Sequence, residues 1–360
     1  MAKKSNEERI REKYSTTLRL VAPGSPLREG LAYILQSGTG GLLVLDDTKR
    51  VKTLCEGGVS IDRPFSPTLL YELSKMDGAI ILNDDASRIV SANVFLAPSR
   101  SIPSMETGTR HSAAERMAKQ TSSALIAISQ KRNSVTLYVG SMKHVLESIP
   151  TLLNKATQAL QTLEKYCNAL REHLEELSIR EFQDMVTIFD VCEAIQRSEM
   201  IRRIGEEIRP YITELGTEGR LVDLQLRELI GAYEEGFLVI KDFYKRRDGN
   251  TAEQTQEAIA GMSSKELLNL NNICNALGYG ANMRVVDTYL SSRGYRILTQ
   301  THRLSQGIIE NLARAFGSLQ AILRAPREEL VAVEGVGEVM AERIRVSLDL
   351  LRNQLALEVR

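Results

Sequence analysis

Residues 330–341 read LVAVEGVGEVMA, in which apolar side chains alternate with glycines. Two glycines at this spacing permit a tight turn between helices, because a residue without Cβ tolerates unusual backbone conformations and close approach. Amide groups at the start of the following helix can then approach a phosphate. We interpret Gly335 and Gly337 as phosphate-turn residues, and three apolar side chains as those that lock the helices together: Val333, Val336 and Ala341. The pattern is typical of a helix-hairpin-helix motif.

A hairpin of this kind predicts binding to the backbone of DNA, without reading its sequence. The G-x-G pattern also occurs in ordinary helix-turn-helix connections, and that alternative stays open. Residues 303–312 with 316–319 resemble a first, degenerate copy of the hairpin. Arginines are the candidates for phosphate contacts, although a solvated helix face explains any single one equally well: Arg324, Arg327, Arg343 and Arg345. The predicted DNA-binding set is Gly335, Val336, Gly337, Arg343 and Arg345.

Composition sets limits on what the chain can be. Its 360 residues suffice for two or three domains, and its formal net charge of zero means that any DNA binding must be local. No apolar run approaches the roughly 20 residues that cross a membrane, and the first residues lack the apolar core of a signal peptide. We therefore expect a cytoplasmic protein. The cysteines form no C-x-x-C pair, which argues against a zinc site: Cys55, Cys167, Cys192 and Cys274.

The first part of the chain, from about residue 16 to 147, alternates short β-rich runs with helical patterns. The expected strands are 41–45, 79–82, 89–90, 124–128 and 135–139. Helices are expected from Ser25-Pro26 and over about 67–75, since a capping serine precedes proline. These features predict an α/β domain around one central mixed sheet.

Strands stop at about residue 148, and a long helical pattern begins. Apolar side chains follow at alternating steps of three and four: Leu153, Ala156, Leu160, Leu163, Cys167, Leu170, Leu174 and Leu177. Such a stripe needs a partner along its length. The following helices and another subunit are both open as that partner. We expect residues 246–264, which are rich in polar residues and glycine, to form a loop.

Two stretches of the α/β domain carry candidate chemistry. In the first, Asp77-Gly78 precedes the strand that begins at Ala79, where a carboxylate can bind a divalent metal or orient a hydroxyl. A plain Asp-Gly turn is the alternative. In the second, Ser112-Ala113-Ala114-Glu115 matches a capping box, which predicts that a helix starts near Ser112. Thr109, Arg110 and His111 would then precede a positive helix terminus and form a phosphate site, or the last two would simply pack there.

These motifs resemble the Asp-Gly-Ala and Gly-Thr-Arg-His-Arg signatures of the diadenylate cyclase domain. The whole chain is similar to the family of bacterial DNA integrity scanning proteins. The resemblance extends through 22–24, 39–41, 154–156, 161–164, 214–219, 293–296 and the hairpin. It implies a diadenylate cyclase domain over 1–147, an all-α spine or linker domain over 148–290, and a tandem helix-hairpin-helix DNA-binding domain over 291–360.

The resemblance also implies an activity: two ATP molecules are condensed to cyclic di-AMP and two pyrophosphates, with Mg²⁺ or Mn²⁺. It implies a homo-octamer in which cyclase domains face each other, inhibition by branched DNA, and a place on the nucleoid. The catalytic residues would be Asp77, Arg110 and His111, with Asp77 holding the metal or orienting the attacking hydroxyl. The ATP-binding residues would be Gly78, Ala79, Leu96, Thr109, Arg110, His111, Ser112, Ala113, Ser129 and Arg132.

One position departs from the family pattern. Ser112 stands where the second arginine of the motif is expected, which removes one charge-assisted contact worth about 2 kcal/mol if it acts in the transition state. If that arginine is structural, Ser112 would instead serve as a helix cap. Three functions therefore stand side by side: a DNA-regulated cyclase, a DNA-junction scanner with a weakened cyclase, and an oligomeric scaffold.

Overall fold

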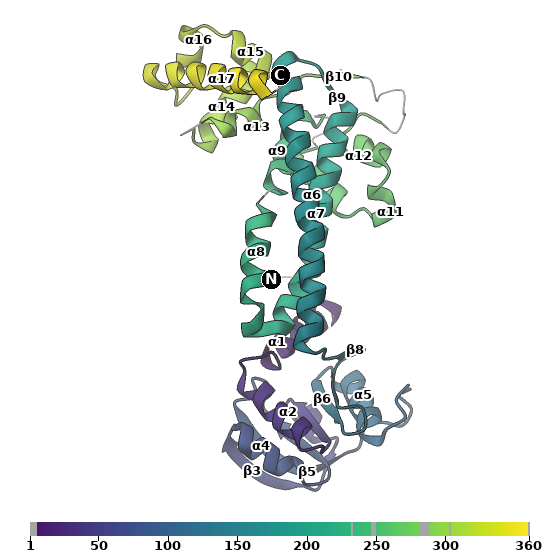
Figure 1. The fold of residues 1–360 in the computed structure, drawn as a ribbon. Helices are drawn as coiled ribbons and strands as arrows, with labels where there is room; N and C mark the ends of the chain where they lie inside the picture. Colours follow the sequence, from purple (N-terminus) through teal and green to yellow (C-terminus); the bar gives the residue numbers. More distant parts are fainter. Residues whose placement is uncertain (1–5, 232, 246–249, 281–287, 302–303, 359–360) are drawn as a thin grey trace. The chain divides into compact units, whose positions relative to one another are not determined.

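The computed structural model describes residues 6–231, 233–245, 250–280, 288–301 and 304–358. The chain divides into two compact units, one made of residues 1–157 and 209–223 and the other of residues 158–208 and 224–360. Helices α6 (Ile149–Gln183), α7 (Ile188–Leu215) and α8 (Arg220–Ile230) contribute to both units (Figure 1). In the part of the chain described, no helix is both long and apolar enough to span a bilayer.

The first unit contains one mixed sheet. Its strands are β1 (Gly41–Leu45), β2 (Cys55–Glu56), β3 (Val59–Pro64), β4 (Ala79–Leu82), β5 (Arg88–Leu96), β6 (Ala124–Ser129), β7 (Ser134–Val139) and β8 (Met142–Val145). They follow the order β2-β5-β4-β1-β6-β7-β8, and β3 also pairs with β5. The β1–β4 pair is parallel and its neighbours are antiparallel. The predicted α/β domain with a mixed sheet is confirmed.

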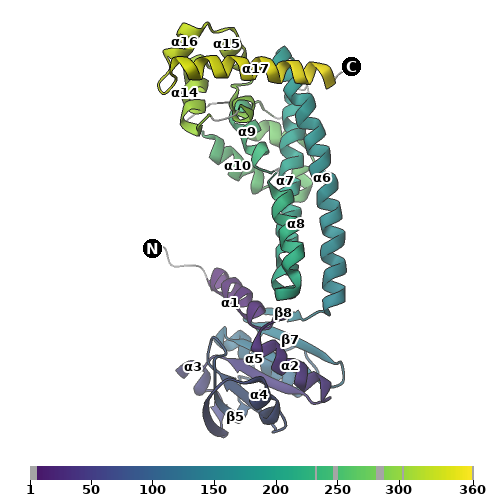
Figure 2. The ribbon, with the colours of Figure 1, turned by 60° about the vertical axis from the view of Figure 1, so that its left-hand side comes forward.

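Helices cover both faces of this sheet, which explains why the central strands are apolar throughout (Figure 2). They are α1 (Asn6–Leu20), α2 (Pro26–Gln36), α3 (Lys49–Lys52), α4 (Pro67–Ser74) and α5 (Thr109–Thr121). Alternate residues of β1 point to opposite faces: Leu43 joins the core beneath α1, α2 and α4, whereas Leu42 joins the core with α5. As predicted, Ser25 caps α2, and its Oγ accepts the amide of Arg28 at 3.1 Å.

The predicted stripe of α6 is buried within the chain itself from Ala156 to Leu177. Within the second unit, α6 runs alongside α7 in both views (Figures 1 and 2). The Cys167 thiol donates to the carbonyl of Leu229 on α8 at 3.4 Å. The partner of the stripe could be another subunit or the following helices. In this structure the following helices cover it.

The rest of the linker is built from α9 (Tyr233–Phe243), α10 (Ala252–Ala260), α11 (Ser264–Leu267) and α12 (Leu270–Ala276). The expectation of a loop over 246–264 is wrong. Residues 246–249 lie outside the described residues, but α10 begins with a capping box between Thr251 and Gln254. The capping box satisfies amides at the start of this mostly polar helix, and Ala252, Thr255 and Ile259 are its buried residues. Strand β9 (Val186–Thr187) pairs antiparallel with β10 (Tyr289–Leu290).

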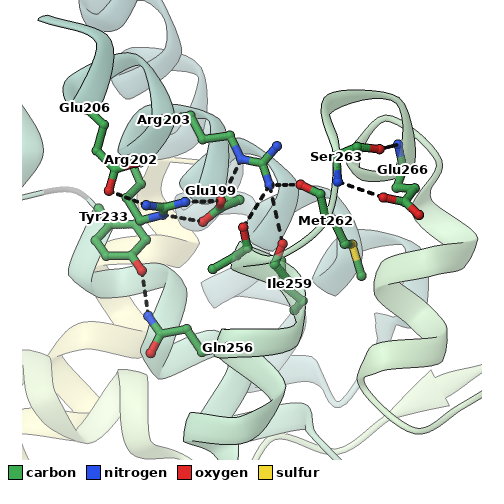
Figure 3. Close-up of polar contacts among 11 residues, drawn as sticks. Glu199, Arg202, Arg203, Glu206, Tyr233, Gln256, Ile259, Met262, Ser263 and Glu266 are labelled. Carbon is green, nitrogen blue, oxygen red and sulfur yellow. Dashed lines mark hydrogen bonds and ion pairs between the residues drawn. The ribbon is translucent and has the colours of Figure 1, made fainter. Parts of the chain in front are cut away.

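An arginine fixes the carboxyl end of α10 (Figure 3). Arg203 Nη2 donates to the carbonyl of Met262 at 2.6 Å and to that of Ala260 at 3.3 Å. Its Nε donates to Glu199 at 2.7 Å, and Arg202 shares that carboxylate at 2.6 Å. These bonds satisfy the carbonyls that a helix end leaves without partners, so α10 is tied firmly to α7.

Among the described residues, the second unit continues with α13 (Tyr295–Gln300), α14 (Gln306–Phe316), α15 (Leu319–Arg324), α16 (Arg327–Val331) and α17 (Glu338–Glu358). Their apolar faces share one core, which includes Ile309, Leu312, Leu330 and Ile344. The predicted helical C-terminal region is thus confirmed.

Candidate functional site

Two cavities open in the first unit, and both reach the start of α5. The first cavity, of about 450 Å³, is lined by Leu42, Asp77, Gly78, Ala79, Val94, Phe95, Leu96, Thr109, Arg110 and Ala113. The second cavity, of about 380 Å³, is lined by Glu106, Thr107, Gly108, Thr109, Arg110, His111, Ile128, Ser129, Gln130, Lys131 and Arg132. Thr109 and Arg110 belong to both, so the cavities adjoin at the first helical turn.

The turn at Asp77-Gly78 connects α4 to β4 and opens the first cavity. Gly78 has φ +91°, and a Cβ there would lie 2.9 Å from the carbonyl carbon of Asn93 and from the carbonyl oxygen of Val94. Both are backbone atoms, so no other residue fits without moving β5. The side chain of Asp77 is fully exposed, and its Oδ1 lies 4.0 Å from Nη2 of Arg110. The turn thus presents a carboxylate to solvent beside a guanidinium.

Helix α5 begins three residues earlier than its sequence predicts. Gly108 is the N-cap, and the amide of Ser112 donates to its carbonyl at 2.8 Å. The predicted capping box is wrong because the carboxylate of Glu115 is engaged elsewhere: it accepts the hydroxyl of Ser104 at 2.6 Å and the amide of Met105 at 3.1 Å. Ser112 is therefore no cap, and its side chain lines neither cavity.

The earlier start of α5 places the phosphate-site candidates inside the helix. Thr109, Arg110 and His111 form the first turn of α5, whose amides have no partner within the helix. Thr109 and Arg110 line both cavities, so this turn lies where the cavities adjoin. Gly40 allows the side chain of Arg110 to lie close to the backbone, since a Cβ there would lie 2.4 Å from Nη1 of Arg110. The hydroxyl of Ser129 accepts the amide of Arg132 at 3.3 Å and shapes the far wall.

A chain of hydrogen bonds holds His111 at the second cavity. Nδ1 of His111 lies 2.9 Å from the hydroxyl of Tyr138, which donates to Oε1 of Glu106 at 2.8 Å. The ammonium of Lys143 lies 2.5 Å from the same oxygen and lowers the pKa of Glu106, with a smaller contribution from Tyr138. Burial lowers the pKa of His111 and raises that of Tyr138. These effects favour the neutral imidazole beside a charged carboxylate.

Of the predicted ATP-binding residues, all but Ser112 line one of the two cavities: Gly78, Ala79, Leu96, Thr109, Arg110, His111, Ala113, Ser129 and Arg132. Asp77, predicted as catalytic and metal-binding, lines the first cavity as well. Sequence reasoning missed Leu42, Val94, Phe95, Glu106 and Tyr138. For Phe95 a signal existed, because it is an aromatic residue at an outward position of a strand, and it is 65% exposed. Nothing in the sequence linked Tyr138 to His111.

The hairpin turn lies between α16 and α17. Gly335 has φ +86°, Gly337 precedes the first turn of α17, and the predicted apolar side chains are buried: Val333, Val336 and Ala341. Arg343, Arg345 and Arg324 are exposed, and Arg327 pairs with Glu338 at 3.0 Å. Acidic side chains are also exposed beside the turn, namely Glu334, Glu338 and Glu342. Positive charge at this surface therefore depends on a few arginines.

The degenerate copy corresponds in part to a second pair of helices. Gly317, with φ +73°, and Ser318 join α14 to α15, and Oγ of Ser318 accepts the amide of Ala321 at 3.2 Å. Residue 303 of the predicted copy lies outside the described residues. A single positive-φ glycine makes this turn, in place of the G-x-G between α16 and α17.

Comparison with known proteins covers nearly the whole chain. Family models match at residues 28–142 (DisA bacterial checkpoint controller nucleotide-binding), 146–286 (DisA bacterial checkpoint controller linker region) and 308–354 (helix-hairpin-helix motif). DNA integrity scanning protein DisA of Clostridium botulinum (strain Loch Maree / Type A3) is 48% identical over 342 residues, 95% of this chain and 96% of the relative. The protein of that name from Carboxydothermus hydrogenoformans is 49% identical over 344 residues, 95% of this chain and 98% of the relative. The chain belongs to the DisA family of DNA integrity scanning proteins.

Proposed function

We propose that the chain is a diadenylate cyclase that condenses two ATP molecules to cyclic di-AMP and two pyrophosphates, and that DNA binding by its C-terminal helices regulates it. The observation that carries the proposal is the junction of the two cavities at Thr109 and Arg110. An apolar cavity with an exposed carboxylate adjoins a cavity lined by cationic side chains and a helix N-terminus. This pairing suits a nucleoside attached to a triphosphate.

In the proposed complex the nucleoside occupies the first cavity. Leu42, Val94 and Leu96 supply apolar walls, and backbone at Gly78 and Leu96 is close enough to contact the nucleotide. The triphosphate extends into the second cavity, where the first turn of α5 and the side chains of Ser129 and Arg132 surround it. Charge-assisted bonds from arginine are the strongest contacts available for phosphate oxygens.

The residues present fit a divalent metal shared with the nucleotide. Asp77 is the one carboxylate among the described residues that line the first cavity, and Mg²⁺ commonly binds one or two carboxylates together with substrate phosphates. Bound there, Mg²⁺ or Mn²⁺ would neutralise charge on the phosphates. Arg110, 4.0 Å from Asp77, would turn toward the phosphates as the nucleotide enters.

The reaction requires two copies of this site. The 3′-hydroxyl of each ATP loses its proton to solvent and its oxygen forms a bond to the α-phosphorus of the other ATP. The bond from that phosphorus to the α–β bridging oxygen breaks, and pyrophosphate leaves with that oxygen. One protomer holds one ATP and cannot close the ring, so we infer face-to-face association of cyclase domains within a homo-octamer. Asp77 orients the attacking hydroxyl, and Arg110 stabilises charge that develops on the phosphates.

Ser112 separates the proposed cyclase from a scanner with a weakened cyclase. Because Ser112 neither caps α5 nor lines a cavity, we expect the unaltered protein to synthesise cyclic di-AMP and Ser112→Arg to change the rate by less than about tenfold. The measurement is chromatography of the product after incubation with ATP and Mg²⁺ or Mn²⁺. Synthesis by Ser112→Arg alone would favour the scanner with a decayed site.

A DNA-regulated cyclase of this kind would reside in the cytoplasm, on the nucleoid. Its regulation by DNA is tested by substituting the arginines of the hairpin. Replacing Arg343 and Arg345 with alanine should lower the slope of log affinity against log salt by about 0.9 per lost phosphate contact. Basal synthesis should persist, while inhibition by branched DNA should weaken. Fluorescence anisotropy over a salt series measures the slope.

The matched control replaces Arg9 and Arg11 of α1, which are also exposed arginines. An unchanged salt slope in the Arg343 and Arg345 variant would contradict the assignment. These substitutions are preferable to removing residues 291–360, because that truncation would also remove Arg296, which is fully buried against Glu181.

A further inference from the structure

The second cavity contains a histidine whose two ring nitrogens differ in what they can do. The carboxylate of Glu106 is held in its charged form by Lys143 and can only accept hydrogen bonds. The hydroxyl of Tyr138 must therefore donate its one proton to Glu106, at 2.8 Å. Its oxygen is left to accept from Nδ1 of His111, at 2.9 Å. The ring proton of neutral His111 is thus placed on Nδ1.

The other ring nitrogen has no partner. Among the described residues, Nε2 of His111 is one of three buried polar side-chain atoms without a hydrogen bond. In the neutral ring fixed by Tyr138, Nε2 carries a lone pair and no proton. A lone pair cannot bind a phosphate oxygen, because both atoms are acceptors. A proton on Nε2 would allow a charge-assisted bond to a phosphate in the second cavity, which His111 lines, once the side chains that shield Nε2 from solvent shift.

Building on the proposed function, we propose that His111 binds the triphosphate as an imidazolium and takes up one proton when ATP binds, with Tyr138 and Glu106 as the positioning residues that impose this requirement. The alternative tautomer, with its proton on Nε2, would leave the Tyr138 hydroxyl to donate to Nδ1. Its oxygen would then face the charged Glu106 without a proton between them. The neutral ring therefore cannot donate a hydrogen bond to a phosphate without an unfavourable contact between the oxygens of Tyr138 and Glu106.

The charges around the ring favour this coupling. Glu106 from the preceding loop stabilises the imidazolium, whereas three cations oppose it in the free protein: Arg110 of α5, Arg132 after β6 and Lys143 of β8. Bound phosphates would neutralise the field of Arg110 and Arg132, both of which line the same cavity. The pKa of His111, which burial lowers in the free protein, would then rise on binding.

The test uses 3′-deoxy-ATP with Mg²⁺, since this probe lacks the attacking hydroxyl and binds without reacting. Calorimetric titration of the full-length protein at pH 7.5, in buffers of different ionisation enthalpy, measures the protons taken up. We expect close to one proton per bound nucleotide beyond that of His111→Gln. By linkage, affinity should fall about tenfold per unit rise in pH, relative to that variant.

Tyr138→Phe separates positioning from structure. Without the hydroxyl, the neutral ring can place its proton on Nε2, so the proton count should fall toward that of His111→Gln while binding persists. If Tyr138 were purely structural, Tyr138→Phe would lower the affinity for the nucleotide and leave the number of protons taken up unchanged. Tyr33→Phe is the matched control, since Tyr33 lies on α2 and its hydroxyl bonds Glu29.

The possible failures are distinguishable. Binding of 3′-deoxy-ATP by the unaltered protein with the same proton count as His111→Gln would overturn this inference and leave the proposed function standing. A Tyr138→Phe variant that keeps the full count would also overturn the role of Tyr138. Absence of nucleotide binding by the unaltered protein would overturn the proposed function and this inference together.

Discussion

Asp77→Asn is expected to lower cyclic di-AMP synthesis by about 10³-fold or more. The substitution keeps the size of the side chain and removes the one carboxylate of the first cavity, which under the proposed function holds the metal or orients the attacking hydroxyl. Losing such a transition-state interaction costs about 4 kcal/mol or more in activation free energy. The side chain is fully exposed, so the fold should be unaffected.

The comparison for Asp77→Asn is Asp47→Asn, because the side chain of Asp47 is half-exposed and pairs only weakly with Lys52, at 3.7 Å. Rates are measured by chromatography of the product under saturating ATP, with assembly checked by light scattering and DNA binding by anisotropy. We expect Asp47→Asn to retain full activity and both variants to assemble and bind DNA. Near-full synthesis by Asp77→Asn would remove the role assigned to this carboxylate.

Arg296→Met is expected to destabilise the second unit by about 3–5 kcal/mol at pH 8, because it leaves buried carboxylates without their cation. Arg296 is fully buried on α13 and pairs with Glu181 of α6, while its Nη2 donates to the hydroxyl of Ser178 at 2.9 Å. Nearby, Asp242 accepts the amides of Tyr295 at 2.7 Å and Arg296 at 2.9 Å. The guanidinium thus pairs directly with Glu181, and its charge also favours the ionised form of Asp242, whose hydrogen bonds come from backbone amides.

The loss should shrink at low pH. Burial, with a smaller contribution from the charge of Glu181, raises the pKa of Asp242 to about 7, and burial also raises the pKa of Glu181. For Asp242 the folded state binds more protons than the unfolded state between about pH 4 and 7, so its contribution to stability falls as pH rises through this window. At pH 5, protonated carboxyls no longer need the cation, and the variant should recover part of its stability.

Unfolding by guanidinium chloride at pH 5 and pH 8, followed by circular dichroism, measures this effect. Arg324→Met is the control, because Arg324 is exposed, and we expect a change within about 0.5 kcal/mol. A loss for Arg296→Met below about 1 kcal/mol at pH 8, or one equal at both values of pH, would show that the buried cluster does not carry the charges described.

Much of the fold follows from sequence because its central strands are apolar runs between turns, as in Gly41–Leu45 and Ala79–Leu82. Strand β3 escapes such reasoning, since most of its side chains are exposed and polar and it pairs with β5 at the sheet edge. Helix α10 is not predicted from sequence for a related reason: its capping box is a clearer helix signal than any apolar stripe along it.

The candidate site shows the same division. Asp77-Gly78 and Thr109-Arg110-His111 stand out by residue type, and the fold brings them to adjoining cavities. The start of α5 was mispredicted because a Ser-x-x-Glu spacing defines a capping box only if the glutamate is free to return, and Glu115 binds Ser104 and Met105. The link between Tyr138 and His111 joins residues 27 apart, which local patterns cannot register.

The most direct test of the proposed cyclase is the stoichiometry of the reaction catalysed by the unaltered protein. Purified protein is incubated with ATP and Mn²⁺ or Mg²⁺, and cyclic di-AMP and pyrophosphate are both quantified, with Asp77→Asn as the blank. We expect two pyrophosphates released for each cyclic di-AMP formed, and neither product above background in the blank. Pyrophosphate without cyclic di-AMP, or no product with either metal, would contradict the proposed cyclase.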